Sequence, residues 1–133
     1  MKFIIIISIF FNIVCCQQYR GAELRTLESF LYGRFDARFM PAQGDGLVSS
    51  FFTYNDDNPN TPWAEIDVEV LGVYSNVVDF NTITRGQASH IRQHYVDFNP
   101  HLDFHTYSFE WTPDYVAWFI DDEEVYRQTG SHI

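Results

Sequence analysis

Cysteine is missing from the sequence after residue 16, because Cys15 and Cys16 both lie in the apolar N-terminal segment. The rest of the chain therefore has no disulfide, no cysteine nucleophile and no thiolate ligand for a metal. Basic residues are also few, since 8 lysines and arginines face 18 acidic residues. The formal net charge of -10 repels phosphate backbones. We expect no nucleic-acid partner and no anionic polymer as substrate, whereas a neutral polymer is permitted.

Glycine and proline, at 7 and 5 residues, are too sparse and irregular for a fibre. Disorder is excluded by a composition that is 46% apolar and 18% aromatic. A length of 133 residues allows one domain with a real hydrophobic core. We therefore expect a single globular domain.

Residues 1–16 have the pattern of a secretory signal peptide. Lys2 precedes an apolar run over residues 3–11, and Val14 and Cys16 lie three and one residues before a cleavage site ahead of Gln17. The run is too short to span a bilayer, which takes about 20 apolar residues. Lipidation of Cys16 is disfavoured, because Cys15 stands where a small residue is wanted. We expect a secreted, extracellular protein with its domain over residues 17–133 and no membrane association after cleavage.

The dominant period beyond residue 17 is two, and no stretch has a convincing helical period. Glycine, asparagine, aspartate and proline punctuate the runs at intervals typical of short antiparallel strands. A hairpin turn is expected at Asp121-Asp122, and a polar loop over residues 55–62. The pattern predicts an all-β fold, an antiparallel β-sandwich, with strands over residues 22–28, 32–40, 47–54, 65–71, 76–83, 89–96, 104–111, 115–120 and 124–128.

Three acids alternate with apolar residues in the expected strand 65–71. Alternation places Glu65, Asp67 and Glu69 on one face and the aliphatic residues on the core face. Like charges at every second position repel one another, and acids are disfavoured in strands. The residues alone leave two interpretations open, a solvated outer face and a functional site.

The functional interpretation follows from the spacing. Cα atoms four residues apart on an extended strand are roughly 13 Å apart, at about 3.3 Å per residue. Inward leaning and strand curvature could bring the carboxyls of Glu65 and Glu69 near the roughly 5 to 5.5 Å that retaining glycosidases use. With Asp67 between them, ionising all three acids is costly, so we expect at least one to keep its proton near neutral pH.

Residues 21–128 resemble glycoside hydrolase family sixteen, especially the lichenase-type endo-β-1,3-1,4-glucanases. The similar phrases are residues 33–39 with Pro41-Ala42, 46–54, Pro62-Trp63, 65–69 with Leu71-Gly72, 104–111 with Pro113, and 118–121. The resemblance implies a curved, concanavalin A-like jelly roll, with Glu65 as nucleophile, Glu69 as acid/base and Asp67 as the assisting carboxylate. One residue between Asp67 and Glu69 is similar to the regular-strand branch, which includes xyloglucan endotransglycosylases. No cofactor is implied.

The resemblance also implies a neutral β-glucan as substrate, and we expect the protein to be a monomer. Pyranose rings pack on aromatic rings while their hydroxyls need polar partners. The expected substrate-binding residues are Trp63, which is our first choice for a stacking platform, and Tyr54, Phe52, Asn81, Glu23 and Arg25. His90 and His94 would suit a metal only on a helix, and the pattern there favours a strand, so no metal site is expected.

Some positions depart from the lichenase pattern. Ala64 stands where lichenases usually carry Asp, and Thr82-Ile83 where they tend to have tyrosines. The family continues through several strands beyond Ile133, so we expect a domain that is incomplete at its C-terminal end. Two alternatives to β-glucan hydrolysis stay open: transglycosylation by the same residues, and a carbohydrate-binding, lectin-like jelly roll without catalysis.

Overall fold

The computed structural model describes residues 20–55, 60–85 and 90–130. These residues form strands and connecting segments, and no helix long and apolar enough to cross a membrane is found among them. The strands are β1 (Gly33–Phe39), β2 (Val48–Tyr54), β3 (Glu65–Leu71), β4 (Val77–Ile83), β5 (Arg92–Tyr95), β6 (His105–Trp111), β7 (Tyr115–Ile120) and β8 (Glu123–Thr129).

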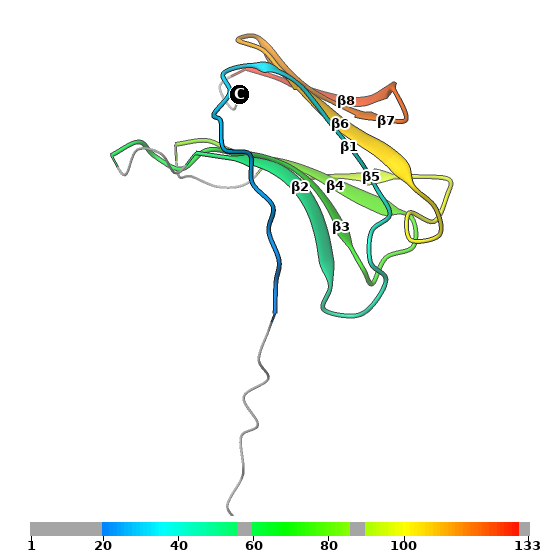
Figure 1. Cartoon of the computed structure of the whole chain (residues 1–133). Coiled ribbons are helices and arrows are strands. Elements are labelled where there is room, and N and C mark those ends of the chain that lie inside the picture. The colour runs from blue at the N-terminus through cyan, green and yellow to red at the C-terminus, as the bar shows by residue number, and fades with distance from the viewer. Residues whose placement is uncertain (1–19, 56–59, 86–89, 131–133) are drawn as a thin grey trace, which may run out of the picture.

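Two four-stranded antiparallel sheets pack face to face (Figure 1). One has the order β1-β6-β7-β8 and the other the order β2-β3-β4-β5. Figure 1 shows β2 and β3 strongly bent, with the other sheet on their convex side. The predicted antiparallel β-sandwich is confirmed.

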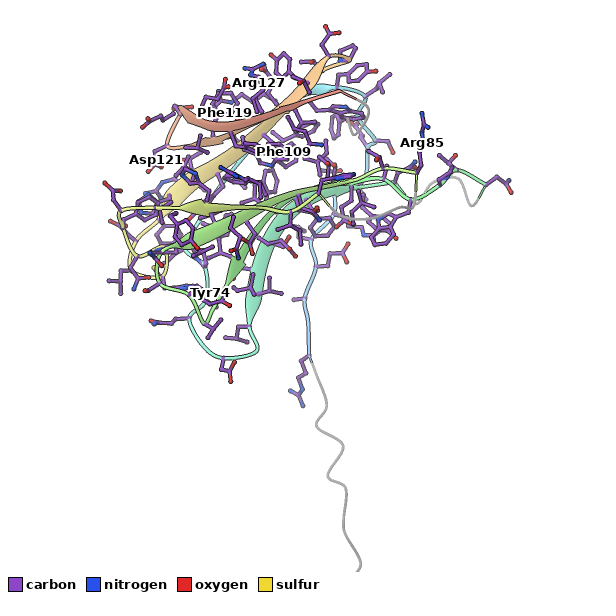
Figure 2. The ribbon with its side chains drawn as sticks, turned by 180° about the vertical axis from the view of Figure 1, so that it is seen from behind. Tyr74, Arg85, Phe109, Phe119, Asp121 and Arg127 are labelled. Atoms are coloured by element: carbon purple, nitrogen blue, oxygen red, sulfur yellow. The ribbon has the colours of Figure 1, made fainter. Side chains whose placement is uncertain are left out.

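Large side chains from both sheets fill the space between them. Val68 and Phe80 from the bent sheet meet Phe109 and Trp118 from the other, and all four are fully buried. In Figure 2 Phe109 lies between the sheets, whereas Arg127 lies on the outer side. This core uses one face of β3 completely, so the alternate residues of β3 point to the concave side of the bent sheet.

The strand predicted over residues 22–28 is wrong. The chain there is irregular, and Leu24 and Leu27 are fully exposed. A period of two is only half of the requirement for a strand, because the backbone also needs a hydrogen-bonded neighbour. Here the Thr26 hydroxyl donates to the carbonyl of Glu28, a local bond that favours a turn. The strand predicted over residues 89–96 is shorter in the structure, where β5 covers Arg92–Tyr95, and residue 89 lies outside the described residues.

The predicted hairpin at Asp121-Asp122 is confirmed as a two-residue connection between β7 and β8. Both aspartates have positive φ, 49° and 68°, as a type I′ turn requires. Asp121 tolerates this conformation because its carboxylate accepts hydrogen bonds from the Thr106 backbone N–H at 2.8 Å and from the His105 ring at 2.6 Å.

Gly72 closes the end of β3 against the loop between β1 and β2. Its N–H donates to the Leu47 carbonyl at 2.8 Å, and its carbonyl accepts from the Gly44 N–H at 3.0 Å. A Cβ at residue 72 would lie 2.4 Å from the Gly44 oxygen, which is backbone and cannot swing aside. Only glycine fits this contact.

We predict that Gly72→Ala lowers the free energy of unfolding by about 1 to 3 kcal/mol, the usual cost of overpacking. Urea unfolding measures it. Gly21→Ala is the matched control, because nothing lies within 4 Å of a Cβ added there. Equal stability of the two variants would contradict the tight backbone contact.

Candidate active site

The three acids of β3 share the concave side of the bent sheet with residues from both neighbouring strands. The register of the strands places Glu65 opposite Tyr54 on β2 and Ile83 on β4. Asp67 and Glu69 lie two and four residues further along β3, on the same face. We call this surface the acidic face, and its members are Ser50, Phe52, Tyr54, Glu65, Asp67, Glu69, Asp79, Asn81 and Ile83.

Asp67 occupies the buried centre of the acidic face and is only 4% exposed. The Asn81 amide, opposite on β4, donates to its Oδ2 at 3.0 Å, and Asn81 in turn accepts from the His90 backbone N–H. From the opposite side, the buried Trp118 indole donates to the backbone carbonyl of Asp67 at 2.9 Å. The strand that carries the acids is therefore held from the core as well as from its neighbours.

Burial raises the pKa of Asp67 to about 8, and the neighbouring Glu65 carboxyl adds to this rise. The Asn81 amide opposes it, because it donates to the carboxylate. Asp67 consequently keeps its proton at neutral pH. This agrees with the expectation that three crowded acids cannot all be charged together.

Glu65 lies at the start of β3, where Trp63 holds it. The Trp63 indole N–H donates to Glu65 Oε2 at 2.9 Å, which fixes the direction of the carboxylate. The indole itself remains 43% exposed and lies 6.2 Å from the Tyr54 ring, centroid to centroid. The geometry thus adds an orienting bond to the stacking role that the sequence predicts for Trp63.

Glu69 is half-buried at the other end of the triplet. The pKa of Glu69 is raised, mainly by burial and to a smaller extent by the charges of Asp79 and Glu65. A carboxyl group whose pKa is raised toward neutrality can donate a proton to a leaving group, whereas a carboxylate on the same face can attack. The acidic face therefore holds one candidate acid and one candidate nucleophile, Glu69 and Glu65, separated by the protonated Asp67.

The remaining predicted substrate-binding residues lie partly on the bent sheet and partly in the irregular segment that precedes β1. Phe52 lies opposite Asp67, and its neighbour Phe51 packs instead on Phe109 in the core. Glu23 and Arg25 form an exposed ion pair, and the Arg25 guanidinium lies 6.0 Å from the centre of the Tyr54 ring. These side chains line a groove that reaches Glu65. Asn81 is buried, and its amide is bonded to Asp67 as described above.

Of the two residues that depart from the tyrosines of the lichenase pattern, only Ile83 belongs to the acidic face. Thr82 faces the core, where its hydroxyl accepts from the Gln128 amide at 2.8 Å. The difference from the lichenase pattern at Thr82 therefore affects core packing. The difference at Ile83 affects the part of the acidic face next to Glu65.

Sequence reasoning missed Asp79, which lies directly opposite Glu69. The signal was present, because Asp79 and Asn81 alternate with Val78 and Phe80 and so share a face. Within residues 20–55, 60–85 and 90–130, no cluster of three His, Cys, Asp or Glu side chains is arranged to hold a metal ion.

Stability should depend on pH through Asp67. Its pKa is about 8 in the folded chain against 3.8 for a free aspartate, so folding binds a proton between these values and stability falls as pH rises from about 4 to 8. Asp67→Asn removes this dependence. Between pH 5 and pH 8 we predict that the free energy of unfolding falls in both chains, and that the fall is larger in the original chain than in the variant by roughly a few kcal/mol.

Urea unfolding at the two pH values measures the difference. The carboxyls of Asp36, Asp121 and Glu124 have lowered pKa values, so they titrate below this window. His94, whose pKa is lowered by burial, contributes equally to both chains and cancels. Parallel pH dependences in the two chains would show that Asp67 is not protonated.

Comparison with known proteins places this geometry in a family of sugar-cleaving enzymes. Residues 11–132 match the family model described as "Glycosyl hydrolases family 16". The chain belongs to glycosyl hydrolase family 16, as the resemblance in the sequence indicates.

Named relatives agree with this assignment. The chain is 43% identical over 111 residues to a "Beta-glucanase" of Acetivibrio thermocellus, a match that covers 84% of this chain and 33% of the relative. A solved β-1,3-1,4-glucanase (lichenase) from a mouse hindgut metagenome is 45% identical with a TM-score of 0.74, over 79% of this chain and 49% of that one. The Bacillus licheniformis β-glucanase is 36% identical with a TM-score of 0.73, over 77% and 48%. The chain thus spans a third to a half of the length of these relatives.

Proposed function

We propose that this chain carries the catalytic strand of a retaining endo-β-glucanase that hydrolyses a neutral β-glucan. The observation that carries the proposal is the acidic face, where Glu65 and Glu69 flank the protonated Asp67 on one concave surface. The names of the relatives, β-glucanase and lichenase, support β-glucan as the substrate class. The net charge of -10 suits an uncharged polymer.

The reaction takes two steps on opposite sides of the anomeric carbon. Glu69 gives its proton to the glycosidic oxygen while the Glu65 carboxylate forms a bond to the anomeric carbon and the C–O bond breaks. Water then attacks the same carbon, Glu69 takes its proton, and the bond to Glu65 breaks. The sugar leaves with its original configuration, because it has been inverted twice.

Asp67 and Trp63 assist by favouring the charged form of Glu65 and by orienting its carboxylate. The protonated Asp67 adds no second negative charge beside the Glu65 carboxylate, and the Trp63 indole fixes one of its oxygens. The same indole N–H stabilises the carboxylate when it leaves the glycosyl intermediate. Exposed aromatic surface on Trp63 and Tyr54 suits the C–H face of a pyranose ring.

Incubation of the chain with barley β-glucan, followed by an assay of reducing ends, tests the proposal. Release of new reducing ends supports hydrolysis. Longer products formed without a net increase in reducing ends would instead indicate transfer to a second sugar. Slower migration of the protein in a gel that contains the glucan, with neither product formed, would indicate a carbohydrate-binding protein that does not cleave.

We also propose that the protein is secreted after removal of residues 1–16, which lie outside the described residues. The support is the charged start, the short apolar run and the polar boundary at Gln17. N-terminal sequencing of the protein recovered from the medium of a secreting host should begin at Gln17. Retention of the whole chain in the cells would contradict secretion.

A further inference from the structure

Asp79 is a fourth acid on the acidic face that the proposed mechanism does not use. It is 8% exposed, its Oδ1 is buried without a hydrogen-bond partner, and it lies directly opposite Glu69 across the β3–β4 pair. Opposite residues in an antiparallel pair have Cβ atoms about 4.5 to 5.5 Å apart. A carboxyl group is unusual in such a position, because burial without full pairing costs free energy.

We propose that Asp79 is a positioning residue that keeps Glu69 protonated, so that Glu69 acts as an acid up to a higher pH than its own burial would allow. This inference rests on the proposed function, in which Glu69 is the proton donor. It requires that Asp79 be charged while Glu69 still carries its proton.

The surroundings of the two acids favour that order of ionisation. Gln93, opposite Asp79 on β5, lowers the pKa of Asp79 by hydrogen bonding to its carboxylate, although burial raises that pKa overall. Glu69 faces the neutral Ser50 on β2, and its pKa is shifted by burial and by neighbouring charges rather than by a hydrogen bond. Burial and the charges of Asp79 and Glu65 together raise the pKa of Glu69. In this proposal the Gln93 donor makes Asp79 the first of the two acids to lose its proton, and the resulting charge opposite Glu69 then holds the proton on Glu69.

Other charged groups near this pair point away from it or lie on the far side of Asp67. Arg92 and His94 flank Gln93 but belong to the core face of β5, where they contact the rings of Tyr126 and Phe80. On the side of the bent sheet that carries the acidic face, the remaining titratable groups are Glu65, Asp67 and Tyr54, together with the exposed Tyr95 two residues beyond Gln93 on β5. Across a few ångströms of partly buried space, one charge shifts a neighbouring pKa by about one to two units.

Titration of Glu69 by ¹³C NMR of its side-chain carboxyl tests the inference without any need for activity. We expect Asp79→Asn to move the midpoint down by about one to two pH units. Asp114→Asn is the matched control, since it removes the same charge from an exposed turn of the other sheet and should leave the midpoint unchanged. If Asp79→Asn does not fold, Asp79→Gln supplies the same loss of charge.

The pH profile of β-glucan hydrolysis then connects the titration to the reaction. Asp79→Asn should shift the alkaline limb of kcat/KM to lower pH by the same amount. An unchanged Glu69 midpoint in the neutral variant, or a change in KM alone with no movement of the limb, would overturn the inference. A midpoint that moves in a chain without glucanase activity would uphold the coupling of Asp79 to Glu69 and count against the proposed function instead.

Discussion

Glu65→Gln should reduce the release of reducing ends from β-glucan by roughly a thousandfold or more. The amide cannot form the covalent bond to the anomeric carbon, and it cannot offset the positive charge that develops there. The bond from Trp63 can still be accepted by the amide oxygen, so the fold around the site should persist. Initial rates with barley β-glucan, compared at equal folded concentration, measure the effect.

Glu123→Gln is the control for this substitution. Glu123 is exposed at the start of β8 in the other sheet, so the loss of its charge should change the rate by less than about twofold relative to the original chain. A Glu65→Gln variant that remained as active as this control would place the nucleophile elsewhere.

Glu69→Ala should reduce the rate on β-glucan by roughly 10²- to 10⁴-fold, because the departing sugar oxygen no longer receives a proton. The loss should depend on the leaving group. A dinitrophenyl β-glycoside departs as a stable anion, so its first step should be nearly unaffected and only the release of the intermediate should slow. A burst of dinitrophenolate followed by slow turnover is the expected kinetic signature.

Azide provides a direct test of this assignment. As an anion it attacks the glycosyl intermediate without help from a base, so it should restore turnover of the Glu69→Ala variant and yield a β-glycosyl azide. Equal losses on β-glucan and on the dinitrophenyl glycoside, with no response to azide, would mean that Glu69 does not transfer protons.

Much of the sandwich could be predicted because alternation of apolar and polar residues is local. The segment 65–71 shows this, since its acids and aliphatic residues separate onto two faces as the period of two requires. Segment 22–28 shows the limit of the same rule, because its pattern resembles a strand but no neighbouring strand pairs with it. The pairing of β1 with β6, which are far apart in the chain, depends on long-range packing that no local pattern contains.

The candidate site divides in the same way. Spacing along one strand was enough to bring Glu65, Asp67 and Glu69 together. The position of Asp79 opposite Glu69 depends on the register of two strands, and the indole bond of Trp63 depends on a rotamer. Neither can be read from a single segment. The resemblance to family sixteen indicated Glu65 and Glu69 but left Asp79 out.

The configuration of the first product tests the central claim most directly. ¹H NMR during the first minutes of β-glucan hydrolysis, before the anomers equilibrate, distinguishes new α and β reducing ends. The proposed double displacement through Glu65 predicts that the β signal appears first and the α signal grows later as the product mutarotates. An α signal that appears first would show a single displacement by water and would contradict a covalent role for Glu65.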